Sequence, residues 1–252
     1  MSQLWRFRSS SGLGSLGSGG GELQELRVLC QETQPFSCAA FHPTRPLIAT
    51  GGWDGKIKIW DTTDMQRKAV RHGHMAAVRC LAISPNADYL VSGDLAGCLI
   101  IWGTKHGDPI QKAFVHKGAV QAVCYLSGQR FVSAGADGDL APDARITSLT
   151  CMPEGADDSH LGVAMLGRDG MVLLWTSDDG WRAPVRSLEA FSVPVSALAW
   201  LENSLLAAGQ DSQLVVYADA DKPDSDELTR RVITGNDAPV CSLAVAVSGV
   251  SA

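Results

Sequence analysis

The sequence predicts an all-β fold built from repeated units of short strands. Four stretches share one pattern, an apolar run, a turn, an alternating run and an aromatic residue: residues 47–61, 90–103, 162–176 and 205–218. Short alternating runs joined by a Gly-containing turn are typical of β-hairpins. The aromatic residue follows the turn residue by five positions in every copy, and one step of 42 residues occurs twice: Trp60 to Trp102 and Trp175 to Tyr217. A fixed period of this length indicates a repeat architecture.

With this pattern and period, the chain resembles the WD-repeat β-propeller family, and its first copy carries the Trp-Asp pair itself at Trp60-Asp61. The resemblance implies units of four strands. These are an inner strand, a second strand, an Asp-Gly turn with a third strand ending in Trp, and an outer strand that leads to the next unit. The expected fold is therefore a WD-repeat β-propeller, which when closed has about 4–8 such blades.

Residues 1–34 are expected to be strand remnants of a preceding blade. Residues 4–7 match a third strand, residues 22–29 match a fourth, and a Gly/Ser-rich loop at residues 9–21 joins them. Residues 12–17 have the G-x-G-x-x-G spacing of a dinucleotide fingerprint. That fingerprint needs a following helix whose N-terminus receives the pyrophosphate, and more glycines follow here instead. A flexible surface loop is the better interpretation.

The repeat units continue from residue 35 to the end. The predicted units are residues 35–72, 73–114, 115–145, 146–190, 191–234 and 235–252. In the first two units the turn glycine precedes the next inner strand by 23 residues, whereas Gly138 precedes Ile146 by only 8. A Trp is expected at position 143, but the residue there is Asp143. We therefore expect a truncated third unit, with an irregular crossing at residues 138–145 because Pro142 cannot donate to a strand ladder.

The array is expected to be incomplete at both ends as well. About five repeat units, with the third truncated and partial blades at both ends, make an open array. Because each repeat buries its faces only against its neighbours, an open array leaves apolar faces and edges exposed. The sequence therefore favours a fragment or splice variant of a longer repeat protein.

Composition agrees with one all-β domain. The chain has 252 residues, 45% of them hydrophobic, and a net charge of −6, so no global field attracts it to phosphate backbones or anionic lipid. The N-terminus lacks the apolar core of a signal peptide, and no apolar run approaches the roughly 18 residues of a membrane span. We expect a soluble protein of the cytoplasm, the nucleus or both.

The cysteines are predicted to be reduced and buried. Seven cysteines form no C-x-x-C pair and are odd in number, which argues against a disulfide framework or a zinc site. Cys38 and Cys80 fall at the same point of their repeats, inside apolar strands. Free cysteine is among the most buried residue types.

The resemblance also implies a structural hydrogen-bond network in each blade, formed by the His of a Gly-His pair, the turn Asp and the strand Trp. The matching residues are His74, Asp54, Asp137, Asp169, Asp211, Trp60, Trp102 and Trp175. His116 stands at the His position of the third unit, although no Gly precedes it. Ala96 replaces the turn Asp of the second unit, so we expect an incomplete network there, and Tyr217 weakens the fifth.

No constellation of catalytic or ligand-binding residues is predicted. His72 and His74 lack a third ligand at a suitable spacing, and the acidic residues at 137, 139 and 143 lack the downstream Glu of a calcium loop. The sequence holds no G-x-S-x-G elbow and no phosphate loop. The expectation is therefore no enzyme activity, no metal, no cofactor and no small-molecule substrate.

Function is then expected to come from exposed loops on a rigid scaffold. The candidate interaction residues are Trp53, Arg45, Arg168, Trp181 and Arg182, together with Asp94-Leu95. Trp and Arg dominate interface energetics, and a Trp in a turn has little core to fill. The leading hypothesis is a non-catalytic protein-interaction scaffold, a WD-repeat segment of a larger intracellular assembly with protein partners.

The alternative is a WD-repeat subunit of a ribonucleoprotein complex, of the telomerase or vault type, with RNA contact. Residues 5–8 interleave aromatic and basic side chains as stacking surfaces do, and Arg67, Lys68 and Arg71 form a basic cluster. The divergent, Ala- and Leu-rich repeats also resemble the C-terminal WD arrays of NACHT-type proteins, including the telomerase-associated protein component. In that family the RNA-binding segment lies outside the WD array, so we do not expect this chain to bind RNA.

Overall fold

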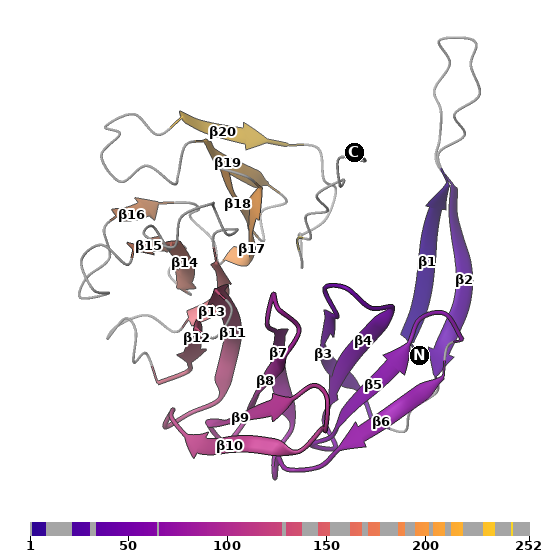
Figure 1. Cartoon of the computed structure of the whole chain (residues 1–252). Helices are drawn as coiled ribbons and strands as arrows, with labels where there is room; N and C mark the ends of the chain where they lie inside the picture. The colour runs from indigo at the N-terminus through magenta and orange to yellow at the C-terminus, as the bar shows by residue number, and fades with distance from the viewer. Residues whose placement is uncertain are drawn as a thin grey trace.

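The structure, a computed structural model, consists of strands joined by turns (Figure 1). It describes residues 2–8, 22–30, 34–64, 66–127, 130–137, 146–151, 162–167, 171–176, 186–189, 195–201, 204–209, 213–218, 229–234 and 243. Within them the chain forms strands β1 to β20 and no helix. In this described part, accordingly, there is no helix with the length and apolar character to cross a membrane.

Four antiparallel sheets have four strands each, paired in chain order. The first holds β3 (Phe36–Phe41), β4 (Leu47–Gly52), β5 (Ile57–Asp61) and β6 (Arg67–Arg71). The second holds β7 (Val78–Ile83), β8 (Tyr89–Asp94), β9 (Cys98–Gly103) and β10 (Pro109–Phe114). The others are β13 (Ile146–Cys151), β14 (Gly162–Gly167), β15 (Met171–Thr176) and β16 (Arg186–Glu189), and then β17 (Val195–Leu201), β18 (Ser204–Gly209), β19 (Leu214–Ala218) and β20 (Thr229–Ile233).

Two further sheets have two strands among the described residues. One is the antiparallel hairpin of β1 (Ser2–Arg8) and β2 (Glu22–Cys30). The other pairs β11 (Val120–Ser127) with β12 (Arg130–Gly135), in the unit expected to be truncated. The predicted crossing at residues 138–145 and a sixth inner strand near residues 240–247 lie outside the described residues, and the unit boundaries stay predictions.

The sheets stand around a common centre, as Figure 1 shows. Their inner strands contact one another in the succession β3, β7, β11, β13 and β17, while the β1–β2 hairpin lies beyond the first sheet. This arrangement confirms the predicted incomplete β-propeller.

Apolar side chains of neighbouring sheets meet to form the core. Ile57 of the first sheet packs in one cluster with Val78, Leu90 and Trp102 of the second. Side chains alternate between the two faces of a pleated strand, so these residues can all point into the space between the two sheets. The second sheet and β11 approach each other closely at Gly93. A Cβ at this position would stand 2.6 Å from Val120, so no side chain fits there.

One cysteine pair departs from the expectation. Cys124 on β11 and Cys151 on β13 form a disulfide, with a Cα–Cα distance of 6.1 Å, so the prediction that all cysteines are reduced is wrong for this pair. The two residues lie on inner strands that become neighbours only in the assembled ring, which no sequence spacing reveals. Cys38 and Cys80 are free thiols, and burial raises the pKa of Cys38 to about 11 and that of Cys80 to about 12.

Candidate functional site

The second sheet contains a complete buried hydrogen-bond network. His74 Nδ1 lies 2.8 Å from Asp94 Oδ2, and His74 Nε2 lies 2.6 Å from Ser92 Oγ. Trp102 Nε1 donates to the same Ser92 Oγ over 2.8 Å. These distances fit a neutral imidazole that donates from Nδ1 to the Asp94 carboxylate and accepts from the serine hydroxyl at Nε2. Burial lowers the pKa of His74 in spite of the neighbouring Asp94.

The expectation that Ala96 leaves the second unit incomplete is therefore wrong. Asp94, the last residue of β8, supplies the carboxylate from two positions earlier. Its Oδ1 also accepts from the backbone N–H groups of Ala96 and Cys98, both at 2.9 Å, so it closes the turn as a turn Asp does. The sequence showed the missing Asp at 96, but the compensating one lay among residues assigned to the strand.

The first sheet also has a buried hydrogen-bond network at its turn, formed by different residues. Trp60 Nε1 donates to Thr50 Oγ1 over 2.8 Å, while the carboxylate of Asp54 accepts from Lys58 Nζ over 3.0 Å. Lys58 is only 4% exposed and its ammonium lies 5.7 Å from the centre of the Phe36 ring. Burial alone would raise the pKa of Asp54, but hydrogen bonds from Lys58 and from a backbone N–H lower it below its usual value. A lysine thus takes the part that histidine has in the second sheet.

The described residues of the third unit repeat the histidine arrangement. His116 Nδ1 lies 3.1 Å from Asp137 Oδ1, and His116 Nε2 lies 2.9 Å from Ser133 Oγ. The second oxygen of Asp137 accepts from the Lys117 N–H over 2.7 Å. Position 143, where a Trp would stand, lies outside the described residues.

In the last two sheets the hydroxyl partner is missing. Trp175 is buried, yet its Nε1 has no acceptor among the residues that the structure describes. By strand register the position of Ser92 corresponds to Met165 on β14, which has no hydroxyl. In the fifth unit Tyr217 replaces the Trp and its hydroxyl is hydrogen-bonded to Arg230. Asp169 and Asp211, predicted for these networks, lie outside the described residues.

Above the first two networks, three large apolar side chains are exposed. Trp53 is 58% exposed, Met75 91% and Leu95 54%. The loop that carries Met75 lies against the first turn, since a Cβ on Gly55 would stand 3.0 Å from the His74 carbonyl oxygen. It also accepts a hydrogen bond from the Leu95 N–H at the Ala77 oxygen, over 2.9 Å. We call the exposed side chains of Trp53, Met75 and Leu95 the turn face.

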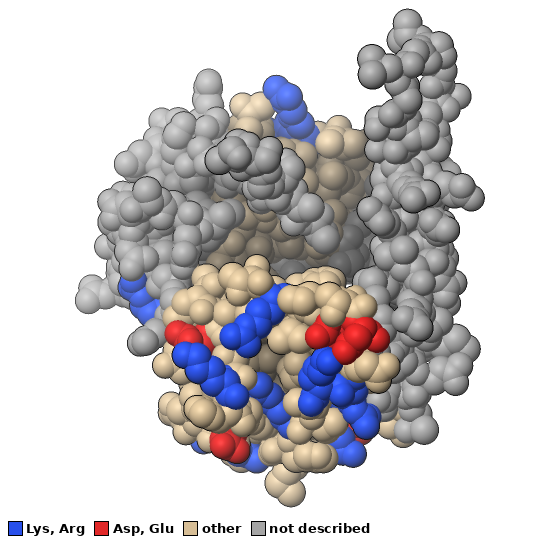
Figure 2. All heavy atoms as spheres, turned by 45° about the vertical axis from the view of Figure 1, so that its right-hand side comes forward, with Lys and Arg blue, Asp and Glu red and all other residues tan. Residues whose placement is uncertain are grey.

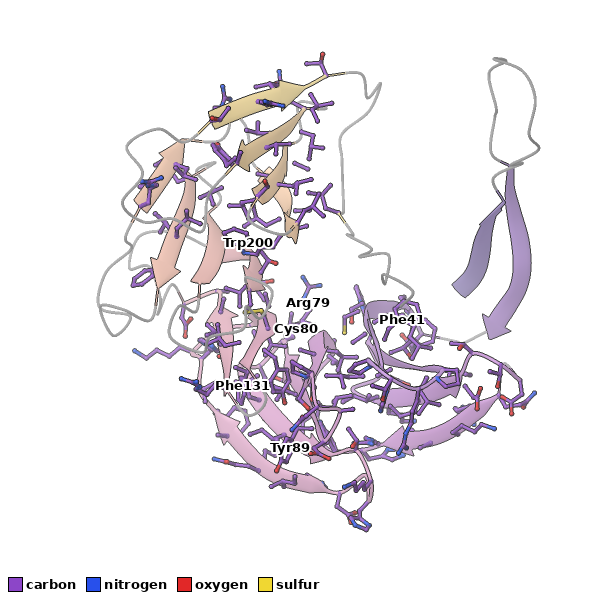
Figure 3. All side chains as sticks on the ribbon, turned by 45° about the horizontal axis from the view of Figure 1, so that its top comes forward. Phe41, Arg79, Cys80, Tyr89, Phe131 and Trp200 are labelled. Atoms are coloured by element: carbon purple, nitrogen blue, oxygen red, sulfur yellow. A yellow bond between two sulfur atoms is a disulfide. The ribbon has the colours of Figure 1, made fainter. Side chains whose placement is uncertain are left out.

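Arg79 lies at the same end of the second sheet. It follows Val78, which pairs with Asp94, and it is exposed. Figure 3 shows its side chain extending from β7 toward the centre around which the sheets stand. The turn face is therefore apolar, with a cationic side chain on its inner side.

The remaining candidate interaction residues do not join this surface. Arg45 is exposed but lies before β4, whereas Trp53 follows it. A strand of this length spans roughly 20 Å, so these two residues stand on opposite sides of the ring. Arg168, Trp181 and Arg182 lie outside the described residues.

The basic cluster considered for RNA is not a set of free cations. Arg71 is buried, and Lys68 pairs with Asp64 at 2.5 Å and with Asp61 at 3.7 Å. Figure 2 shows Lys and Arg side chains spread among Asp side chains over the face of the first two sheets. The side chains of residues 5–8 lie outside the described part.

One group of side chains has the composition of a metal site. Potential ligand atoms of His74, Asp94 and Cys98 lie within 4.8 Å of one another. Both ring nitrogens of His74 are, however, already hydrogen-bonded to Asp94 and Ser92. This geometry is explained by the blade network without an ion.

Comparison with known proteins places this geometry in a family. The family described as the IFT140 first beta-propeller matches residues 14–144, more than half of the 252 residues. The chain belongs to the WD-repeat β-propeller family. That membership accounts for the recurrent hydrogen-bond networks and for the order of strands in each sheet.

Particular relatives are similar over parts of their length. Telomerase protein component 1 of Rattus norvegicus is 28% identical over 197 residues, which are 72% of this chain and 7% of that protein. Small ribosomal subunit protein RACK1 of Drosophila melanogaster is 28% identical over 134 residues, 51% of this chain and 41% of that protein. A chain of the mitotic checkpoint complex crystal structure has a similar fold, with a TM-score of 0.71 at 18% identity over 88% of this chain and 71% of that one. The chain thus spans only a small part of the telomerase component.

Proposed function

We propose that the chain is a non-catalytic protein-interaction scaffold and that the turn face contacts a protein partner within a larger assembly. The observation that carries this proposal is the exposure of Trp53, Met75 and Leu95 on turns that buried networks hold in place. Large apolar side chains fixed on a rigid support lose little conformational entropy on binding and are typical interface anchors.

The relatives support a place in multi-subunit complexes. RACK1 is named as a small ribosomal subunit protein, and the structural neighbour is part of a mitotic checkpoint complex. We infer by analogy a protein partner in the cytoplasm or nucleus for this chain. Trp181, Arg168 and Arg182 remain proposed contributors beyond the described residues.

Photo-crosslinking tests the turn face. A photoreactive residue replaces Met75, which is the most exposed of the three, and the crosslinked proteins are identified from cells that express the chain. We expect Trp53→Ala to remove the specific crosslinks, since truncating an anchor costs about 2 kcal/mol or more. Ile110→Ala is the matched control, because Ile110 is 60% exposed but lies on the outer strand β10. Equal crosslinking by the Trp53 and Ile110 variants would contradict the proposal.

A second candidate function, RNA contact in a ribonucleoprotein, is suggested by the similarity to telomerase protein component 1. We propose that it does not reside in this chain, since Lys68 is ion-paired and the buried Arg71 adds no cation to an open surface that a phosphate backbone could follow. We expect no measurable RNA affinity at physiological salt. Tight binding that falls steeply with salt, and that is lost when Arg6, Arg8, Arg67, Lys68 and Arg71 are neutralised, would reverse this conclusion.

A further inference from the structure

A pocket lies between the first and second sheets, on the side of the ring opposite the turn face. Its empty volume, which includes the open solvent at its mouth, is about 380 Å³. Most of its lining is aliphatic and comes from β4, β5, β7 and β8, whereas His42, Arg45, Arg71 and Thr104 provide polar groups. None of the described residues that line it is acidic. The pocket thus combines an apolar floor with two cationic side chains.

Arg71 is the central cation of the pocket and is unusually placed. The residue is 8% exposed, and its guanidinium lies 6.0 Å from the centre of the Trp102 ring. Nη1 donates to the Gly103 carbonyl over 3.0 Å and Nη2 to the Thr104 carbonyl over 3.4 Å. Nε has no acceptor among the described residues, and Arg71 forms no direct ion pair with any of them. Burial lowers the pKa of Arg71, and the negative charge of Asp108 acts against this shift without a direct ion pair. Buried charges are normally paired, so a carboxylate in direct contact would suit this guanidinium.

The surroundings hold the guanidinium in this position. A Cβ on Gly107 would stand 3.8 Å from Arg71 Nε, so the turn before β10 packs directly against the group. Gly107 has a φ of +79°, which favours glycine at this position. Because the side chain is already ordered by these contacts, an anion that enters the pocket meets a pre-organised donor.

His42 and Arg45 supply further donors at the rim. The Nδ1 atom of His42 accepts from the backbone N–H of Thr44 at 3.3 Å and from that of Arg45 at 3.1 Å. The proton of the neutral ring is therefore on Nε2, which can donate to a ligand. Arg45 is exposed and forms no ion pair within the described part of the chain.

Net charge favours an anionic occupant. Residues 34–137 hold eleven Lys and Arg against seven Asp and no Glu, a net charge of +4, although the whole chain carries −6. The blades around the pocket are therefore locally basic within an acidic chain. A carboxylate suits the pocket better than a nucleic acid, since no Phe, Tyr or Trp is among its described lining residues for base stacking.

We propose that this pocket binds an acidic segment of a protein partner, with one Asp or Glu carboxylate at Arg71 and Arg45 and an adjacent aliphatic side chain on the apolar floor. A guanidinium and a carboxylate form charge-assisted hydrogen bonds, which are stronger than those between neutral groups. The site is independent of the turn face, so the chain has two binding surfaces on opposite sides of the ring.

An array of acetylated and amidated hexapeptides, probed with the full chain, tests the proposal. The central residue is Glu, Gln or phosphoserine, and the neighbouring positions cover the aliphatic residues and Ser. We expect Glu-centred peptides with an aliphatic neighbour to bind at least about tenfold more tightly than their Gln counterparts, as measured by fluorescence anisotropy of the best sequences. If no Glu-centred peptide exceeds its Gln counterpart, or if phosphoserine binds best, the proposal is overturned.

Variants of the chain locate the binding. Arg71→Met removes the charge while keeping an apolar chain of similar length, and we expect it to reduce the Glu preference about tenfold or more. Arg45→Gln, at an exposed position that does not threaten folding, should reduce it by a smaller factor. Trp53→Ala is the control and should leave it unchanged, because Trp53 lies on the opposite side. A Glu preference that survives both arginine substitutions would place the peptide elsewhere and refute the site.

Discussion

The first and second sheets both contain a buried hydrogen-bond network that holds the turn, but different residues form it. In both, a strand Trp donates to a hydroxyl and a carboxylate fixes the turn, but the carboxylate is Asp54 in one and Asp94 in the other. The partner of that carboxylate is the ammonium of Lys58 in the first sheet and the ring of His74 in the second. The blade geometry therefore requires a buried donor–acceptor chain and not one set of residue types.

The difference lies in charge. The Lys58–Asp54 pair is ionic, and the lysine side chain is 5% exposed. A buried ion pair carries a desolvation cost, and losing one partner leaves the other charge uncompensated. The His74–Asp94–Ser92 arrangement buries no cation, because the imidazole of His74 is neutral. The first sheet should therefore be more sensitive to loss of its acid, and the second to pH.

The largest expected effect is that of Asp54→Ala. It removes the Asp54 carboxylate that accepts from the buried Lys58 ammonium, so we expect the first sheet to lose up to about 3–5 kcal/mol of stability against opening. Hydrogen exchange of peptides that cover β5, read by mass spectrometry, measures this locally. The double variant Asp54→Ala with Lys58→Met should recover most of the loss, since an apolar side chain then replaces the buried ammonium.

A matched control comes from the same sheet. Lys68 and Asp64 have the same four-residue separation as Lys58 and Asp54, but both side chains are 45% exposed. We expect Asp64→Ala to cause no measurable change, because water solvates the lysine left behind. Similar effects of the two Asp substitutions would mean that burial of Lys58 does not matter, contrary to the comparison.

Much of the fold was readable from the sequence, because the positions that define a blade are local. The turn glycines, the closing aromatic residues and the period all lie within short stretches, and the observed strands β4, β5, β8 and β9 follow them. The short spacing before Ile146 likewise agrees with two described strands in the third unit.

The blade chemistry was less predictable, since hydrogen bonds depend on where side chains point in three dimensions. Lys58 occupies a polar position of the alternating run within residues 47–61, yet it is buried over Phe36. Arg71 was assigned to an exposed basic cluster, yet its side chain lies against Trp102 in the next sheet. In both cases a side chain from another strand, of the same sheet for Lys58 and of the next sheet for Arg71, decides what is covered.

The serine and threonine hydroxyls provide a second, smaller test. Ser92 Oγ serves both His74 Nε2 and Trp102 Nε1, whereas Thr50 Oγ1 accepts from Trp60 Nε1 alone among side chains of described residues. Ser92→Ala leaves two buried polar groups unpaired and should cost roughly 2–4 kcal/mol, while Thr50→Val leaves one and should cost roughly 1–2 kcal/mol. Local hydrogen exchange of β9 and β5 measures both. Equal losses would show that His74 does not depend on the serine.

The smallest effect expected is a difference in pH dependence between the two sheets. Burial holds the pKa of His74 below its ordinary value of 6.5, while the unfolded chain titrates near that value. Below pH 6.5 the unfolded state therefore binds more protons than the native one, so the stability of the second sheet is present above this pH and is lost as the pH falls toward the native pKa. Asp94 opposes the shift and Lys112 adds to it.

The first sheet has no histidine in its network, although the pKa of His42 in its β3–β4 loop is also lowered. The comparison is therefore made in a His42→Gln background, with exchange rates corrected for the intrinsic effect of pH. We expect protection of β9 to fall more than that of β5 between about pH 7.5 and pH 5.5, because only β9 depends on a neutral imidazole. His74→Gln should make the two sheets respond alike. If β5 loses as much protection as β9 in the His42→Gln chain, the neutral-network account of the second sheet is wrong.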